Sequence, residues 1–260
     1  MNNYFHNKVV LITGGAGGIG SALCSKLLVE GAKVIILDLD VTDIRNNDQL
    51  LAIQLDICDK AQLKAAVTEA LTRFKTIDVL INNAGVAHMS RFDDLSEADF
   101  DKVIEINFTA AVSLTRLCLP QLKQSNGHIV AVSSVAGFAP LYGRTAYSAS
   151  KHALQGFFLS LASELEQVSV TIVCPSFVRS RPELQVQVNK GLSSPGAEKK
   201  DTGGEQIAPD SAAIQILSAV EKKQRILYLG KISKISRWLY ALFPKLFLKL
   251  MLKKARAEFS

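Results

Sequence analysis

The sequence has 260 residues, of which 48% are hydrophobic and 21% charged, and its formal net charge is +6. This composition excludes a disordered chain and predicts a globular protein with a substantial core. The positive charge lies at one end: residues 231–260 contain eight Lys or Arg and one Glu, a net +7, so the first 230 residues carry −1. We therefore do not expect the main body to bind nucleic acid.

Cysteine usage and the N-terminus favour a reducing compartment. The four cysteines are widely spread, with no C-x-x-C pair and no His at ligand spacing: Cys24, Cys58, Cys118 and Cys174. We expect free thiols and no metal site. Residues 1–8 are polar and lack the apolar run of a secretory signal. Residues 238–252 are apolar, but they are shorter than a bilayer span and are interrupted by Pro244 and two lysines. The expected location is the cytoplasm.

Short, apolar, β-branched runs predict seven buried strands, at residues 9–13, 34–38, 52–56, 79–82, 128–133, 170–175 and 226–229. Between them, segments with apolar residues at helical spacing predict helices that include 19–30, 60–74, 97–123 and 146–166. Continuous apolar strands separated by helices are typical of a parallel sheet covered on both faces. We therefore predict an α/β fold: a doubly wound, seven-stranded parallel sheet of the Rossmann type, in a single domain over residues 1–230.

The first predicted strand ends in a glycine-rich turn that suits a dinucleotide. Residues 13–20 read Thr-Gly-Gly-Ala-Gly-Gly-Ile-Gly, and a helix follows directly. Glycines permit a tight turn and let the backbone approach a pyrophosphate, whose charge then faces the helix N-terminus. The predicted cofactor contacts in this loop are Gly14, Gly18, Ile19 and Gly20.

Asp38 ends the second predicted strand, eighteen residues after Gly20. A carboxylate at this place accepts hydrogen bonds from the ribose hydroxyls of adenosine and repels a 2′-phosphate. The glycine loop and the neighbours of Asp38 include no Arg or Lys that would bind such a phosphate. The sequence therefore predicts NAD rather than NADP as the cofactor.

Two residues at the start of the helical segment 146–166 form a candidate proton-transfer pair. Tyr147 and Lys151 are four positions apart, so their side chains share one face of a helix. A free tyrosine has a pKa of about 10 and is a poor base at neutral pH. A neighbouring ammonium favours the phenolate and brings the tyrosine towards its working range. Ser134 follows the fifth predicted strand, at the carboxyl edge where an open-sheet enzyme places its site.

These motifs occur in a recognisable order along the chain. The run Thr13–Gly20, Asn82–Gly85, Asn107, Ser134, Tyr147 and Lys151 resembles the short-chain dehydrogenase/reductase family in its NAD-linked form, over residues 5–182 and more loosely over 207–230. The resemblance implies that Tyr147 is the general acid/base and that Ser134 polarises the substrate carbonyl. It also implies that Lys151 lowers the pKa of the tyrosine and binds the nicotinamide ribose, and that Asn107 holds a water in the proton relay.

The resemblance assigns further cofactor contacts beyond the glycine loop. The matching residues are Asp56 and the adjacent Ile57 at adenine, and Asn83, Ala84 and Gly85 at the nicotinamide. Pro175 ends the sixth predicted strand, but Ser176 follows it where family members commonly have Gly. Ser180 is expected to supply the hydroxyl that a Thr supplies in the family, beside the nicotinamide carboxamide.

Two polar residues near the Asn83–Gly85 run have structural interpretations. Asn82 is expected to tie neighbouring strands together. His88 is isolated in a loop; it either faces the substrate or is a bystander, and the second case is the more common. We expect the polar, glycine-containing stretch 181–209 to be a substrate lid, because connections of that length inside a compact domain are usually functional.

The preferred interpretation is an NAD(H)-dependent oxidoreductase that interconverts a secondary alcohol and a ketone, on a hydrophobic substrate. An NAD-binding scaffold or sensor with vestigial catalytic residues, or a membrane-attached adaptor, would leave the same cofactor motifs. The helices 97–123 and 146–166 are rich in Ala, Leu and Phe beyond what packing on a sheet needs. In the family, the equivalent helices pair across a two-fold axis, which implies a homodimer or homotetramer.

The tail, residues 231–260, carries basic residues at spacings compatible with one stripe on helical structure, between 234 and 256. Pro244 is expected to start a new helix, because its ring suits a first turn. Apolar residues fill the remaining faces. Such a segment either lies on a membrane surface with its lysines among anionic headgroups, or folds over the substrate cleft or a partner subunit.

Overall fold

The computed structural model describes residues 4–179 and 206–259, with their side chains up to Lys253. Seven parallel strands form one sheet in the order β3-β2-β1-β4-β5-β6-β7. They are β1 (Val9–Thr13), β2 (Lys33–Asp38), β3 (Leu50–Gln54), β4 (Val79–Asn82), β5 (His128–Val132), β6 (Ser169–Pro175) and β7 (Ile226–Leu229). The predicted doubly wound α/β fold is confirmed.

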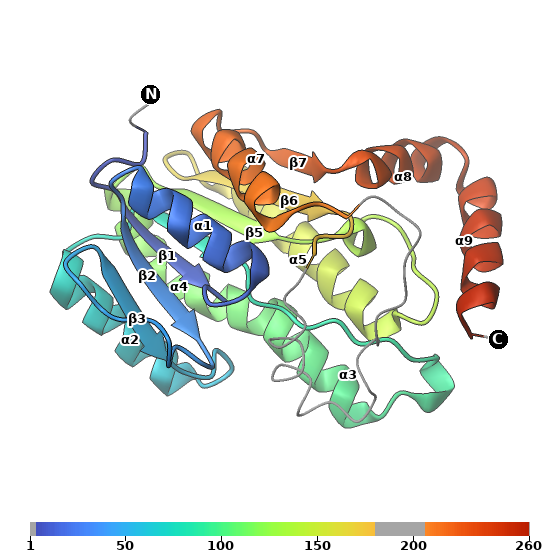
Figure 1. Ribbon diagram of the computed structural model, residues 1–260. Coiled ribbons are helices and arrows are strands. Elements are labelled where there is room, and N and C mark those ends of the chain that lie inside the picture. Colours follow the sequence, from blue (N-terminus) through green and yellow to red (C-terminus); the bar gives the residue numbers. More distant parts are fainter. Residues whose placement is uncertain (1–3, 180–205, 260) are drawn as a thin grey trace.

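Helices cover both faces of this sheet (Figure 1). On one face lie α1 (Gly18–Val29) and α7 (Pro209–Glu221), and on the other α2 (Lys60–Phe74), α4 (Ala110–Gln124) and α5 (Thr145–Glu164). Alternate residues of β1 supply the two cores: Val10 and Ile12 pack with α1 and α7, whereas Val9 and Leu11 pack with the other three helices. Because both faces of the sheet are buried, the strands are continuously apolar, and these apolar runs in the sequence predict them.

The predicted third strand lies two residues too late. The ladder between β2 and β3 ends where Asp38 pairs with Gln54. The carboxylate of Asp56 instead accepts a hydrogen bond from the Cys58 amide at 2.9 Å, which makes a turn before α2. Asp56 is therefore an exposed turn residue beyond the strand.

The single predicted helix 97–123 is built from three segments: α3 (Glu97–Ile104), a π-helical turn η2 (Glu105–Thr109) and α4. Taken together, Glu97–Gln124 is long and apolar enough to cross a membrane by length and composition alone. One side of it, with Val103, Leu114 and Cys118, is buried in the protein core. That packing accounts for its apolar character.

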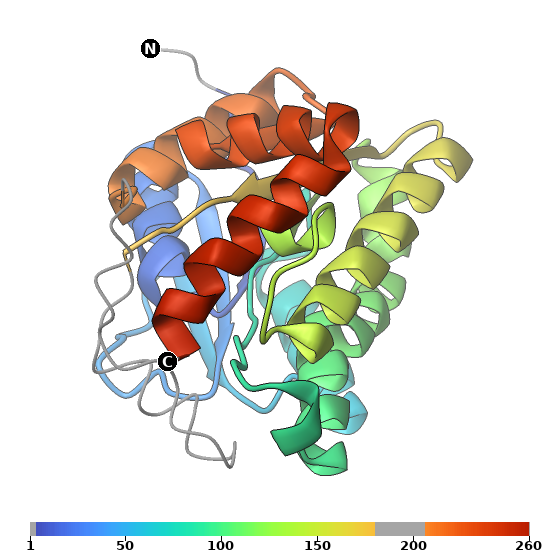
Figure 2. The same cartoon turned by 90° about the vertical axis from the view of Figure 1, so that its right-hand side faces the viewer.

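The strand order reverses between β1 and β4, so the chain leaves the sheet in opposite directions from these two neighbours. In open α/β sheets, ligands bind outside the carboxyl ends of the strands at such a switch point. After β7, α8 (Lys231–Leu242) and α9 (Pro244–Phe259) follow, and α9 begins at the predicted proline. In Figure 2, α9 crosses in front of the carboxyl edge of the sheet.

Candidate active site

The loop between β1 and α1 has a backbone that admits glycine alone at two places. Gly14 has φ +65° and donates its amide to the Leu37 carbonyl at 2.8 Å, which joins the loop to β2. A Cβ atom on Gly20 would collide with the Gly14 carbonyl oxygen. At the N-terminus of α1, Gly17 provides no side-chain cap, and the first turn carries no acidic residue. The residues at this turn therefore fit a bound pyrophosphate, whose charge the helix N-terminus favours.

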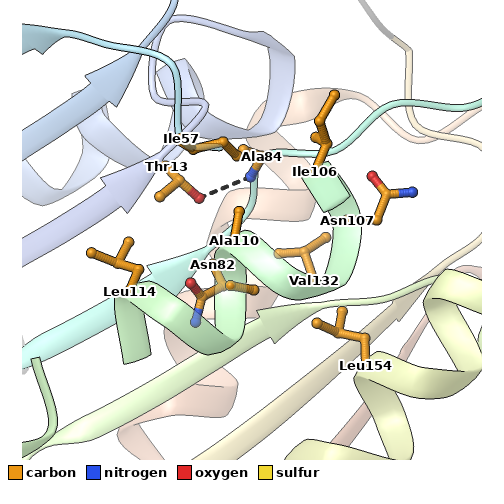
Figure 3. Close-up of a pocket in the computed structure, with 11 residues that line it drawn as sticks. Thr13, Ile57, Asn82, Ala84, Ile106, Asn107, Ala110, Leu114, Val132 and Leu154 are labelled. Atoms are coloured by element: carbon orange, nitrogen blue, oxygen red, sulfur yellow. Dashed lines mark hydrogen bonds between the residues drawn. The ribbon is translucent and has the colours of Figure 1, made fainter. Parts of the chain in front are cut away.

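The Asn83–Gly85 segment is fastened to the end of β1 (Figure 3). The Thr13 hydroxyl oxygen accepts hydrogen bonds from the amides of Asn83 and Ala84, each at 3.0 Å. The Asn83 side chain donates in turn to the carbonyls of Thr13 and Gly14, each at 3.0 Å. These bonds hold the predicted nicotinamide-side loop and the predicted pyrophosphate loop in one rigid unit.

Asp38 lies at the carboxyl end of β2, beside the glycine loop. Its Oδ2 accepts a hydrogen bond from the Ala16 amide at 2.9 Å, and its Oδ1 accepts one from the Leu39 amide at 2.8 Å. Burial raises the pKa of this carboxyl, and backbone hydrogen bonds oppose that rise. The geometry places a carboxylate next to the loop, as a contact to an adenosine ribose requires.

Ser134, Tyr147 and Lys151 come together at the carboxyl edge of β5. Ser134 lies two residues after the end of β5 and caps the short 3-10 helix η3 (Val135–Gly137), with its hydroxyl accepting from the Ala136 amide at 3.2 Å. The same hydroxyl lies near the phenol of Tyr147, on the first turn of α5, close enough to lower the pKa of that phenol. Lys151 lies one turn further along α5, with its Nζ 5.8 Å from the centre of the tyrosine ring.

The lysine is held by the sheet. Its ammonium donates to the carbonyl of Val132, the last residue of β5, at 2.9 Å, and the side chain is buried. Gly85 lies close by, since a Cβ atom added there would be 3.3 Å from the lysine Nζ and 3.0 Å from Oδ1 of Asn107. A side chain at position 85 would fill the space between Lys151, Asn107 and the nicotinamide-side loop.

Asn107 lies at the centre of the π-helical turn η2 and is buried. Its amide nitrogen donates to the Val86 carbonyl at 3.0 Å and to the Ser150 hydroxyl at 2.9 Å, and its Oδ1 accepts from the Val86 amide at 2.8 Å. π-Helical turns inside α-helices are frequent at functional sites. The turn here positions an asparagine that links α5 to the loop after β4.

The electrostatics of the pair come from burial and two neighbours. Burial raises the pKa of Tyr147, and the Ser134 hydroxyl and the Arg144 guanidinium lower it. Burial lowers the pKa of Lys151 to about 8. The phenol is therefore protonated at neutral pH. The pKa of Lys151 lies only about one unit above neutral pH.

Arg144 is a site residue to which the sequence analysis gave no role. Its guanidinium carbon lies 6.0 Å from the centre of the Tyr147 ring, and Nη2 contacts the Met89 sulfur at 3.5 Å. The available signal was its position three residues before Tyr147, which places the two side chains within reach where a helix begins.

Other predicted residues lie elsewhere or outside the described residues. Asn82 donates to the Thr115 hydroxyl at 3.1 Å, so its side chain ties β4 to α4 rather than to another strand. His88 is buried, with Nε2 3.9 Å from a carboxylate oxygen of Asp99 on α3, so its side chain packs inward. Pro175 ends β6 as predicted, and Ser176 approaches Gly230. Ser180 and most of the 181–209 stretch lie outside the described residues.

A small cavity lies behind the site, between β4, β5 and the α4 segment (Figure 3). Its volume is about 10 Å³, and Ile57, Asn82, Ala84 and Asn107 are among the lining residues. This volume is about that of one water molecule, so the cavity is too small for a substrate. In the part of the chain that the structure describes, no three His, Cys, Asp or Glu side chains are grouped to hold a metal ion.

The fold and this site define a class of protein, an α/β oxidoreductase that works with a nicotinamide cofactor. A family model described as short chain dehydrogenase matches residues 8–191. The chain belongs to the short-chain dehydrogenase/reductase family. Dehydrogenase/reductase SDR family member 7B of Mus musculus is 32% identical over 271 residues, which cover 98% of this chain and 83% of that relative.

Solved structures agree on the fold. A short-chain dehydrogenase from Streptomyces avermitilis has a TM-score of 0.78 and 26% identity, with 96% of this chain and 98% of that chain covered. Two others are 23% identical and show the fold alone. One, from Burkholderia phymatum in complex with NAD, has a TM-score of 0.75 over 87% of this chain and 90% of that one. The other, from Burkholderia cenocepacia in complex with NADP, has 0.79 over 95% and 98%.

Proposed function

We propose that the protein is an NAD(H)-dependent oxidoreductase that interconverts a secondary alcohol and a ketone on a hydrophobic substrate. The observation that carries the proposal is the placement of Ser134 beside Tyr147 at the carboxyl edge of the sheet, one helical turn from the buried ammonium of Lys151. Beside the pair lies a loop whose glycines and helix N-terminus fit a dinucleotide. Bound nicotinamide supplies or accepts the hydride.

The chain's own residues handle the proton. Tyr147 donates its phenolic proton to the substrate oxygen during ketone reduction and takes it back during alcohol oxidation. Ser134 holds the substrate oxygen against that phenol. Because burial raises the pKa of Tyr147, the phenol alone is an acid at neutral pH. In the oxidation direction, the nearby charges of Lys151 and Arg144 stabilise the phenolate.

The surroundings of Ser134 support a hydrophobic substrate. Val135 and Ala139, one and five residues after the serine, are buried and pack with Phe247 of α9, and Phe138 and Met251 pack at their edge. The backbone amide of Tyr142 donates to the Met251 sulfur at 3.2 Å, so α9 is attached to the loop that leads to Tyr147. An apolar wall of this kind favours a substrate with apolar groups next to its carbonyl.

Three further parts of the proposal concern the enzyme's surroundings. Asp38 supports NAD, because a 2′-phosphate would meet its carboxylate. The four cysteines are free thiols in the structure, which supports a reducing compartment such as the cytoplasm. The outer sides of α4 and α5 support a homo-oligomer, and the tail, residues 231–260, supports contact with a membrane surface.

The experiment that tests the chemistry is Tyr147→Phe, which removes the proton and keeps the ring. We expect kcat to fall about 10²–10⁴-fold on a panel of hydrophobic secondary alcohols and ketones, with NAD binding unchanged in a fluorescence titration. Tyr4→Phe, the same change far from the site, is the matched control and retains full activity. A Tyr147→Phe variant with more than about a tenth of the original rate would show that another group carries the proton.

A further inference from the structure

One side of α8 presents a row of large apolar side chains to solvent. Ile235, Trp238 and Leu242 are three and four positions apart, so they share one face of the helix. They are 63%, 69% and 61% exposed. The opposite side of α8 is already used: the Ser233 hydroxyl, fully buried, donates to the Cys174 carbonyl at 2.7 Å. α8 therefore packs on the protein body through its Ser233 side, and the apolar row lies on its solvent-exposed side.

The row continues through the turn into α9. Phe243 is 58% exposed and Leu246 47%, whereas the next residue, Phe247, is buried against Tyr240 and the loop after β5. Phe247 and Met251 thus anchor α9 while the turn stays outside. The apolar row consists of Ile235, Trp238, Leu242, Phe243 and Leu246. Contiguous apolar surface on the outside of a protein marks a binding site.

Cationic side chains lie on the same two helices as the apolar row. Lys231 and Lys234 lie on α8, and Lys245 and Lys249 lie on α9, and all four are exposed. Residues 231–260 carry a net +7, whereas the other 230 residues carry −1. A second copy is a poor occupant, because it would bring two +7 segments together or offer a nearly neutral body. A lipid bilayer with anionic headgroups over an apolar interior complements both the apolar row and the positive charge of residues 231–260.

We propose that the α8–α9 hairpin is a peripheral membrane-binding surface that inserts its apolar row into the interface of an anionic lipid bilayer. The tryptophan lies at headgroup depth, where its apolar ring and N–H are both accommodated, and the lysines pair with anionic headgroups. Because α9 crosses the carboxyl edge of the sheet, attachment holds the active site beside the membrane (Figure 2). The inference rests on the membrane contact proposed above for the tail and does not depend on the oxidoreduction.

Co-sedimentation with vesicles tests the proposal, using the full-length protein and phosphatidylcholine with or without phosphatidylserine. We expect binding to need phosphatidylserine and to weaken as salt is added. Trp238→Ala should lower the partition coefficient about tenfold by removing inserted apolar surface. Lys234→Glu should lower it at least about fivefold, because each basic residue near an anionic surface contributes about that factor.

Two matched controls distinguish binding through this face from non-specific adsorption to vesicles. Ile235→Ser should weaken binding, whereas Ile214→Ser, the same change at a 56% exposed position of α7, should leave it unaltered. Likewise Lys64→Glu, on α2, should bind as the unmodified protein does. Circular dichroism confirms that each variant is folded. Equal binding of Ile235→Ser and Ile214→Ser would overturn the proposal. A second result would also overturn it: the unmodified protein does not bind vesicles, and Trp238→Ala halves the mass measured by light scattering. A second copy of the chain would then cover the apolar row.

Discussion

At the carboxyl end of β2, Asp38 has one structural role and one proposed role, and a substitution can separate them. Its Oδ2 holds the glycine loop through the Ala16 amide at 2.9 Å, and we propose that its charge repels a 2′-phosphate. We expect kcat/KM to be at least about tenfold higher with NAD(H) than with NADP(H), about 1.4 kcal/mol in transition-state binding. Asp38→Asn removes the charge but keeps an acceptor for Ala16, so it should narrow this ratio without loss of the fold. Asp40→Asn, two residues further on, should not. Equal or better efficiency with NADP(H) in the unmodified protein would contradict the assignment.

His128 makes the stability of the fold depend on pH. The Thr171 hydroxyl donates to the Gln224 carbonyl at 2.7 Å, so it accepts from His128 Nε2–H at 2.8 Å, while the buried Nδ1 has no partner among the described residues. Burial lowers the pKa of this imidazole from 6.5 to about 4. Below pH 6.5 the unfolded chain therefore binds a proton that the folded protein does not, and folding loses stability as pH falls towards 4.

For His128 we expect the free energy of unfolding to drop by about 2 kcal/mol between pH 7 and pH 5, measured by urea denaturation. His128→Gln keeps an N–H donor for Thr171 and does not titrate, so most of this drop should disappear. His6→Gln, at an exposed position, is the control and should retain the full pH dependence. Parallel curves for His128→Gln and the unmodified protein would show that another group is responsible.

At the scale of secondary-structure elements, the sequence predicted what depends on continuous burial and local spacing. All seven strands were found, because a doubly covered parallel sheet needs unbroken apolar runs such as Val9–Thr13. The break in the helix 97–123 was missed. The π-helical turn there follows from bonds between Asn107 and two distant partners, Val86 and Ser150, and no local pattern encodes them.

The same limit applies to the candidate site. Ser134, Tyr147 and Lys151 were recognised from their order along the chain, and the structure places them together. Their electrostatics were predicted only in part. The sequence suggested Lys151 as the cation near the tyrosine, and the structure adds a second cation, Arg144, whose charge lowers the pKa of Tyr147. Whether a residue such as Arg144 lies near the phenol depends on side-chain directions that spacing along the chain does not fix.

At the scale of the whole molecule, α4 and α5 leave an apolar outer surface. Phe108, Leu117, Phe157 and Leu161 are only half-buried, with the Phe108 and Phe157 rings packed edge to face at 6.0 Å between centres. Between them, the exposed side of α5 carries Gly156, where a Cβ atom would meet nothing within 4 Å. A glycine in an exposed helix interior costs about 1 kcal/mol relative to alanine. That cost is offset if another helix approaches closely at this point.

A homodimer in which α5 faces its symmetry mate gives Gly156 such a neighbour. We expect light scattering at micromolar concentration to give at least twice the 28.2 kDa of one chain. Gly156→Arg should return the mass to that of one chain, because the new side chain fits the isolated protomer but collides across a two-fold axis. Because arginine forms helices better than glycine does, the monomeric variant should keep its helix content, and the substitution itself should not lower its thermal midpoint. Thr68→Arg, which adds the same side chain to the exposed face of α2, should leave the dimer intact. A sharp monomer mass for the unmodified protein would refute the dimer. A Gly156→Arg variant that remains dimeric would place the interface on another surface.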